Sequence, residues 1–182
     1  MLSYLRSRSR IKFPKLTQKT IVPAIEKRLR SLGLSLPPAP LPPPGVVLPL
    51  QFVHIVGARA LISGHGPQNS DGTFAPPLGK LGRELTVEQG YLAARLTALS
   101  ILGSLKRVLG DLDRIVAWSR VFGMVNSAPG FNQQPTVING FSDLILGVFG
   151  PNIGAHSRSA VGMAELPFNI PVEIEGEVEL AE

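Results

Sequence analysis

Arg158 has the surroundings of a residue that binds a carboxylate. Its neighbours Ser157, Ser159 and Ala160 are small, so they leave room for a ligand beside the guanidinium group. A guanidinium binds a planar carboxylate through two parallel hydrogen bonds. The residue therefore predicts a carboxylate site, although an arginine at the start of a strand can equally be solvated or paired with a nearby glutamate.

The sequence around this arginine resembles a known family signature. The pattern R-S-A-V-x-x-A-x-L-P at 158–167, followed by V-E-I-E, resembles the C-terminal signature of the RidA superfamily, also called YjgF/YER057c/UK114. It is closest to the branch described as chorismate mutase-like or endoribonuclease (L-PSP), and the resemblance covers about residues 22–182. The best-known members hydrolyse reactive enamines and imines. The resemblance implies that Arg158 binds the substrate carboxylate and that Glu173 faces the same cleft.

The resemblance also assigns residues that would bind substrate. The run S-G-H-G-P at 63–67 corresponds to a family S-G-Q-x-P run, which assigns Ser63 and Gly64 to the site. A glycine lets the backbone approach a ligand because it has no Cβ atom. Asn139 would supply an amide to the cleft, and backbone groups of Ala160 would hold the ligand. Without the resemblance, S-G-H-G-P only ends a strand and Asn139 is an exposed helical residue.

Two helices and several strands must position these residues. Residues 48–56 and 59–66 favour two strands joined at Gly57-Ala58, and 114–126 is rich in β-branched and aromatic residues. Thr86 and Gln89 form a capping-box pattern that predicts a helix through Leu109, and a second helix is expected over 136–149. In the first helix one buried face is predicted from its leucines: Leu92, Leu96, Leu99, Leu102, Leu105 and Leu109.

The order strand-strand-helix-strand-helix-strand-strand predicts an α+β fold with two helices on one face of a mixed sheet. The last strand alternates apolar residues with glutamates over 172–180, as expected of a strand with one buried face. The other sheet face would then need a cover, which a second copy could supply. The resemblance implies a chorismate mutase-like, RidA-like fold that assembles as a homotrimer with ligand clefts between subunits.

The amino-terminal part differs from the rest in charge. The chain has a net charge of +5, and residues 1–30 contain nine basic residues and one acidic residue. We therefore divide the chain into a basic extension (1–20), a short helix and Pro-rich linker (21–45) and a RidA-like domain (46–182). The extension has the composition of a mitochondrial transit peptide or of a disordered tail. The expected location is cytoplasmic or mitochondrial.

Composition excludes several chemistries. The chain has no cysteine, so it has no disulfide and no thiolate nucleophile. His54, His65 and His156 lack the spacing of metal ligands, and we predict no metal site and no cofactor. The uncharged run 121–142 is too rich in Pro, Gly, Asn and Gln for a membrane span.

Three functions remain as hypotheses. The leading one is hydrolysis of a small 2-imino or enamine acid to the keto acid and ammonia, with Arg158 and Glu173 as the acting residues. The second is a non-catalytic trimeric module that binds small carboxylates. The third is an endoribonuclease that uses His65 or His156, which the mildly acidic remainder of the chain disfavours because phosphate contacts dominate RNA affinity. The deaminating branch commonly carries Cys where Ala160 stands and an aromatic where Val47 stands.

Overall fold

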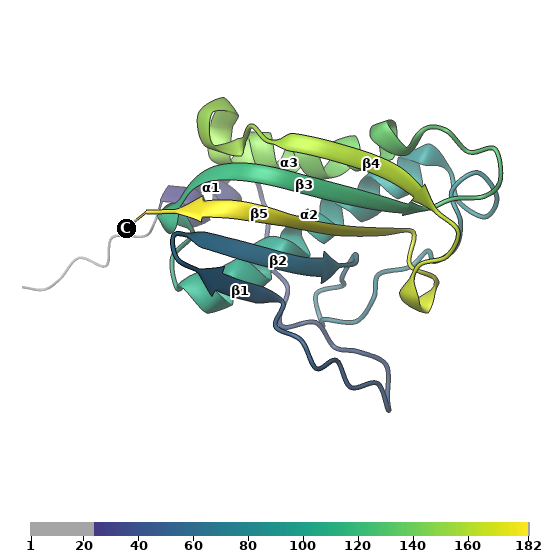
Figure 1. Ribbon diagram of the computed structural model, residues 1–182, viewed down its shortest axis with the longest axis horizontal. Helices are drawn as coiled ribbons and strands as arrows, with labels where there is room; N and C mark the ends of the chain where they lie inside the picture. Colours follow the sequence, from purple (N-terminus) through teal and green to yellow (C-terminus); the bar gives the residue numbers. More distant parts are fainter. Residues whose placement is uncertain (1–23, 182) are drawn as a thin grey trace, which may run out of the picture.

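The protein forms a single five-stranded sheet with the strand order β1-β2-β5-β3-β4 (Figure 1). The computed structural model describes residues 24–181, so the predicted basic extension lies outside the described residues. Neighbouring strands are antiparallel except β3 and β4, which run parallel, so the sheet is mixed as predicted. The strands are β1 (Val53–Val56), β2 (Arg59–His65), β3 (Ile115–Asn126), β4 (Ser157–Met163) and β5 (Val172–Leu180).

Two long helices cover one face of this sheet (Figure 1). They are α2 (Val87–Leu109) and α3 (Gln134–Gly154), and they pack against each other as well as against the sheet. The core between them is apolar, with Ile101, Leu105, Val121, Phe141 and Ile174 among its fully buried side chains. This arrangement confirms the predicted α+β fold. Within residues 24–181, no helix is long and apolar enough to cross a lipid bilayer.

The start and end of α2 follow the predicted signals. The Thr86 hydroxyl accepts the Gln89 backbone N–H at 3.3 Å, and the Gln89 side-chain oxygen accepts the Thr86 N–H at 2.9 Å. These two bonds satisfy donors that the first helical turn leaves without partners. Gly110 ends the helix with φ 75°, a left-handed conformation that favours glycine.

The predicted leucine face of α2 is wrong in its first half. Leu92 is 57% exposed, whereas the small residues Ala94 and Ala98 are fully buried. The reason is the close approach of the two helices: a Cβ atom at Gly140 of α3 would lie 2.0 Å from the carbonyl oxygen of Tyr91. Small residues face α3 where the backbones meet, so the leucine there turns outward. Leucines line the buried face only further along, at Leu102, Leu105 and Leu109.

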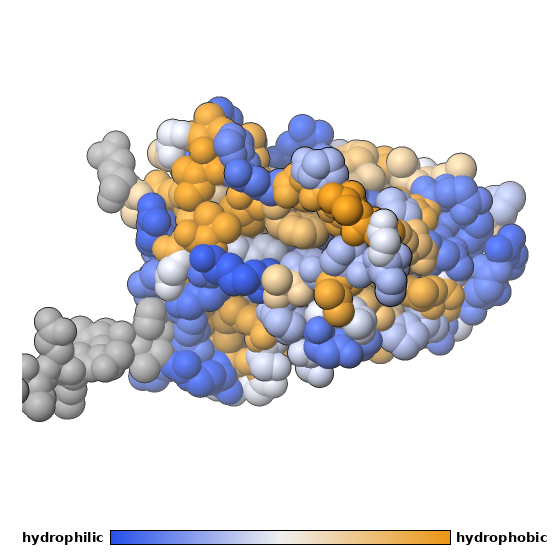
Figure 2. Space-filling view, turned by 90° about the horizontal axis from the view of Figure 1, so that it is seen from below, coloured by the Kyte–Doolittle hydropathy of each residue, from blue (hydrophilic) through white to orange (hydrophobic). Residues whose placement is uncertain are grey.

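The Pro-rich segment lies along the domain surface. The carbonyl of Pro37 accepts a hydrogen bond from Arg107 Nη1 at 3.1 Å, and the Leu41 N–H donates to the Gly72 carbonyl at 3.0 Å. Before it, α1 (Ala24–Ser31) packs on α3. Figure 2 views the edge that carries β1 and this segment and shows apolar residues gathered there. The exposed apolar side chains of the Pro-rich segment and of the residues that follow it up to β1 are Leu41, Val47, Leu48 and Leu50.

The other face of the sheet is open. The described residues 24–181 place no helix over it (Figure 1). On β5 the glutamates point to this face while Val172, Ile174 and Val178 are fully buried against the helices. Leu61 of β2 and Phe122 of β3 lie among the glutamates of the open face, beside the Arg59–Glu177 ion pair of 3.0 Å.

Candidate functional site

Glu173 of β5 lies directly against Gly64 of β2. A Cβ atom at position 64 would lie 1.9 Å from Glu173 Oε1 and 2.8 Å from its Cδ, so only glycine fits beside this carboxylate. The pairing of β2 with β5 is irregular between Ile62 and His65, and Gly64 lies within that irregularity. The structure therefore brings together two residues that the sequence selected separately.

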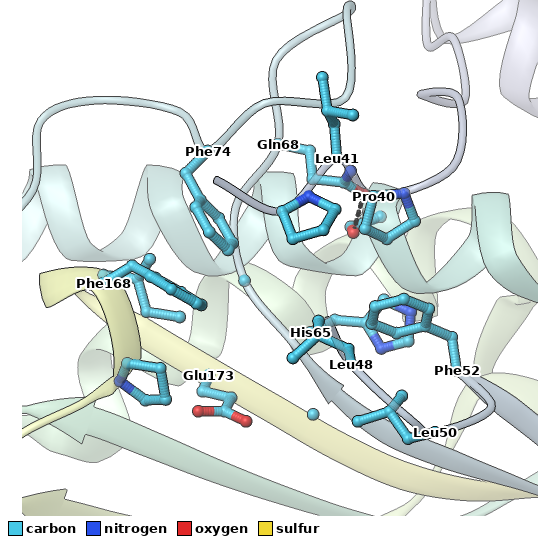
Figure 3. Close-up of a pocket in the computed structure, with 16 residues that line it drawn as sticks. Pro40, Leu41, Leu48, Leu50, Phe52, His65, Gln68, Phe74, Phe168 and Glu173 are labelled. Carbon is cyan, nitrogen blue, oxygen red and sulfur yellow. Dashed lines mark hydrogen bonds between the residues drawn. The ribbon is translucent and has the colours of Figure 1, made fainter. Parts of the chain in front are cut away.

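Both residues line a hollow of about 200 Å³ at the edge of the sheet, where β1 no longer covers β2 (Figure 3). The walls come from the Pro-rich segment, the end of β2, the loop after it and the turn before β5. Most wall residues are apolar: Pro40, Leu41, Pro42, Leu48, Leu50, Phe52, Phe74, Pro167, Phe168 and Ile170. Among the described residues that line the hollow, Glu173 is the only acidic one.

The apolar surroundings change the acidity of Glu173. Burial raises the pKa of the Glu173 carboxyl, and the negative charge of Glu175 raises it further. Burial disfavours the charged form because the carboxylate loses hydration. A carboxyl group with a raised pKa exchanges protons nearer to neutral pH, which suits an acid or base in catalysis.

His65 holds the end of β2 in place. Its Nδ1 donates to the carbonyl of Ser63 at 2.7 Å, so Nε2 accepts the hydroxyl of Ser104 on α2 at 2.8 Å. Burial lowers the pKa of His65 to about 4, so the ring is neutral at physiological pH. Since the side chain is 2% exposed and both ring nitrogens are bonded, His65 is placed to fix the backbone beside Gly64.

Arg158 lies on the opposite side of the sheet. Its Nη1 donates to Ser142 Oγ at 2.9 Å and its Nη2 donates to the Pro135 carbonyl at 3.3 Å. Both acceptors belong to α3, so the guanidinium is held on the face that the helices cover. An arginine has five N–H donors, and the described residues accept two of them. A bound carboxylate could take others.

A histidine supports the serine that holds Arg158. His156 Nδ1 donates to the Gly154 carbonyl at 2.7 Å, so Nε2 accepts the Ser142 hydroxyl at 2.9 Å. Burial lowers the pKa of His156, and the charge of Arg158 acts in the same direction. The neutral His156 ring accepts the hydroxyl proton of Ser142. The Ser142 oxygen then accepts the N–H of Arg158 through a lone pair.

Arg158 and Glu173 do not meet within one chain. Along β3, Arg158 lies opposite Val121 and Glu173 opposite Met124. The two residues are therefore offset by three positions along β3 and lie two strand spacings apart, because β3 separates β5 from β4. Together these displacements put their Cα atoms about 14 Å apart. Their side chains also leave opposite faces of the sheet. One small molecule cannot contact both residues of the same chain.

The remaining selected residues lie in three different places. The Ser63 hydroxyl donates to the carbonyl of Gln51 at 2.8 Å, and the residue borders a shallow hollow on the open sheet face. Ala160 of β4 packs against the core beside Gly123, on the same sheet face as Arg158. Asn139 is exposed on α3. Within one chain these three residues do not form one site.

Two features of the structure, one in the site and one elsewhere, were not predicted from the sequence. The first is the apolar wall supplied by Leu48, Leu50 and Phe168, for which the only signal is the run V-V-L-P-L-Q-F at 46–52. The second is buried Lys80, whose Nζ donates to Asn126 Oδ1 at 2.8 Å and pairs with Glu165 at 2.9 Å. Lys80 thereby ties the loop before α2 to the ends of β3 and β4.

One group of carboxylates in the described residues comes close enough to hold a metal ion. Glu26, Asp111 and Asp113 each offer an oxygen atom, and these atoms lie within 4.8 Å of one another. Asp113 accepts the first two N–H groups of α1 at 2.7 and 2.8 Å, and Glu26 Oε1 pairs with Lys106, whereas Glu26 Oε2 is buried with no hydrogen-bond partner among the described residues. The group thus joins α1 to the domain.

Comparison with known proteins decides the family. Residues 26–174 match the model of the family described as "YjgF/chorismate mutase-like, putative endoribonuclease". The chain belongs to this family. Protein TCP17 of Trypanosoma cruzi is 42% identical over 156 residues, which cover 86% of this chain and 94% of that protein.

Solved structures agree with this YjgF/chorismate mutase-like membership. Protein Atu1372 of Agrobacterium tumefaciens is 41% identical, with a TM-score of 0.76 over 87% of this chain and 93% of that one. A protein of Shewanella oneidensis described as "a putative endoribonuclease" is 33% identical, with a TM-score of 0.77 over 86% of this chain and 99% of that one. TdcF of Escherichia coli, solved with bound serine, is 18% identical with a TM-score of 0.53 over 79% and 94%, and shows the fold alone.

Proposed function

We propose that this protein hydrolyses small 2-imino or enamine acids to 2-oxo acids and ammonia. The observation that carries the proposal is a half-buried carboxylate with a raised pKa, Glu173, held against the backbone of Gly64 in an apolar hollow. Such a carboxylate can take a proton from water, because its apolar surroundings raise its pKa and so make it a stronger base. The family membership and the serine-bound TdcF neighbour support a small-molecule ligand.

The reaction needs no oxidant and no metal. An enamine such as 2-aminoacrylate first tautomerises to the imine, with one proton moving from the nitrogen to the methylene carbon. Glu173 then takes a proton from a water molecule, whose oxygen adds to the carbon of the C=N bond. The proton returns to the nitrogen, the hydroxyl proton follows as the C=O bond forms, and the C–N bond breaks to release ammonia. Arg158 binds the substrate carboxylate through parallel hydrogen bonds and so fixes the reacting carbon near the water.

The site forms between copies of the chain. In one chain Arg158 and Glu173 lie about 14 Å apart on opposite sheet faces. The Glu173 of one subunit must therefore act together with the Arg158 of a second subunit. A homotrimer with three equivalent clefts satisfies this requirement and covers the open sheet face, where Leu61 and Phe122 lie. Light scattering should therefore give a trimer, and a stable monomer would contradict the interfacial site.

Activity of mixed subunits tests the proposal directly. Glu173→Gln should slow hydrolysis of freshly generated 2-aminoacrylate about a hundredfold, the usual share of acid–base catalysis. Arg158→Ala should weaken carboxylate binding about tenfold or more. When equal amounts of the two variants are unfolded and reassembled together, about a quarter of the clefts should contain both functional residues. Ammonia release should recover accordingly.

Control variants show whether the loss and the recovery of ammonia release come from Glu173 and Arg158 themselves. Glu175→Gln removes the next carboxylate on the same strand, which is exposed, and should retain most activity. Each variant reassembled alone should keep its own lowered activity. If ammonia release is the same with wild type, with Glu173→Gln and without protein, while Arg158 is still needed to bind a 2-oxo acid, the protein is a binding module.

The geometry gives less support to RNA cleavage. His65 and His156, the residues that such a reaction would use, are each hydrogen-bonded through both ring nitrogens and have lowered pKa values. Burial disfavours the protonated form of both rings, which is the form that a general acid needs. Cleavage of RNA by the purified protein, abolished by His65→Ala or His156→Ala, would reverse this preference.

A further inference from the structure

The hollow beside Glu173 offers one polar group to a ligand and a large apolar surface. Gln68 is occupied, because its Oε1 accepts the Ser100 hydroxyl and its Nε2 donates to the Gly72 carbonyl at 3.0 Å. His65 uses both ring nitrogens, as described above. Among the described wall residues, Glu173 is the polar side chain that no hydrogen bond within the chain holds, so its carboxylate is the group most available to a ligand (Figure 3).

The apolar walls have the shape and chemistry of an aromatic side-chain pocket. Phe74 and Phe168 stack with ring centroids 5.1 Å apart at 27°, and Phe52 lies 5.0 Å from the His65 ring at 57°. Offset-stacked and tilted rings are the arrangements that a further aromatic ring prefers to join. Leu48 and Leu50 line the hollow beside Phe52, across from Pro40 and Leu41 of the Pro-rich segment (Figure 3). A volume of about 200 Å³ holds one large side chain and is well below that of a pocket for a whole drug-sized ligand.

We infer that the substrates are 2-imino acids with a large aromatic side chain, an inference that rests on the proposed function. The reacting carbon must lie within one water molecule of Glu173, and Glu173 lines the hollow. The side chain on that carbon then enters the apolar hollow, while the carboxylate extends toward the Arg158 of a second subunit. A methyl group would leave the hollow largely unfilled.

The preference should be large enough to measure. Moving a phenyl ring from water into such a pocket favours the aromatic substrate over the alanine-derived one by about 10- to 100-fold in kcat/KM. The imino acids of phenylalanine, leucine and alanine can be generated in the assay by an amino acid oxidase, with ammonia release measured above the spontaneous rate. Phenylpyruvate and pyruvate serve as non-reacting ligands in calorimetry.

Leu48→Ala and Phe168→Ala should each lower about tenfold the ratio of kcat/KM for the phenylalanine-derived substrate to kcat/KM for the alanine-derived one. Both residues are partly exposed, at 38%, so these variants should fold. Leu92→Ala is the matched control, because Leu92 is 57% exposed on α2 and lies outside the hollow.

The outcomes distinguish this inference from the proposed function. Turnover with equal kcat/KM for the three substrates, or a preference for the leucine-derived one, would overturn the aromatic assignment and leave the deaminase. Absence of turnover together with tight phenylpyruvate binding that Leu48→Ala weakens would overturn the deaminase and leave the aromatic pocket. Absence of any difference between phenylpyruvate and pyruvate binding would overturn the pocket.

Discussion

Replacing Gly64 by alanine should slow the proposed imine hydrolysis without unfolding the protein. The new Cβ atom would lie 1.9 Å from Glu173 Oε1, whereas ordinary contact begins near 3.4 Å, so the carboxylate must move by about 1.5 Å. The glutamate side chain can make this movement by changing its torsion angles, and Gly64 has no left-handed backbone angle that alanine would strain. Stability should therefore change little, while a displacement of this size in a catalytic group costs about a hundredfold in rate.

The assay compares kcat for imine hydrolysis with the midpoint of urea unfolding. Gly147→Ala is a matched control, because a Cβ atom there meets no atom within 4 Å. A double variant decides whether Gly64 acts through Glu173. In a Glu173→Gln background, Gly64→Ala should lower the rate no further, because the two changes affect one interaction. Equal losses in both backgrounds would refute the reasoning.

Three further predictions concern the supports of the site. Ser142→Ala removes an acceptor of Arg158 and should raise KM about 3- to 10-fold with kcat nearly unchanged, as steady-state kinetics would show; an unchanged KM would mean that the serine does not position the arginine. The pKa of Glu173 is higher in the folded state than its ordinary value of 4.5. The stability that the protonated Glu173 contributes to the folded state is therefore fully present below pH 4.5 and is lost as the pH rises above it. Glu173→Gln should therefore melt at a higher temperature than wild type at pH 7, and the difference should vanish below pH 4.5; a difference that persists there would contradict the cause. Gly140→Ala forces α2 away from α3 and should cost about 1–3 kcal/mol in urea unfolding, against a neutral or stabilising Gly147→Ala.

Local signals in the sequence predicted the elements well. The Thr86 capping box, the left-handed Gly110 and the alternating glutamates of the last strand each depend on residues a few positions apart. The second helix is less regular than predicted: Gly150, at φ 74°, interrupts it as expected, but a further turn continues to Gly154. The outward turn of Leu92 could not be predicted, because it depends on how closely α3 approaches.

The site itself was predicted only in parts. The resemblance led to Gly64 and Glu173, which the structure places in contact. It could not show that Arg158 leaves the opposite face of the sheet, since that depends on the register of β4 against β3. The apolar walls arise from segments more than a hundred positions apart, such as Leu48 and Phe168, and no local pattern links them.

The attachment of α1 has a consequence for the order of folding. Its first two N–H groups donate to Asp113, which lies 89 and 88 positions further along the chain. A helix of eight residues is not stable alone in water, so α1 forms only after the 3-10 helix Leu112–Arg114 is in place. During synthesis the first described helix is therefore among the last to fold. In the native protein it should also open first, and the amides of Ala24 and Ile25 should exchange with deuterium well before those of α2.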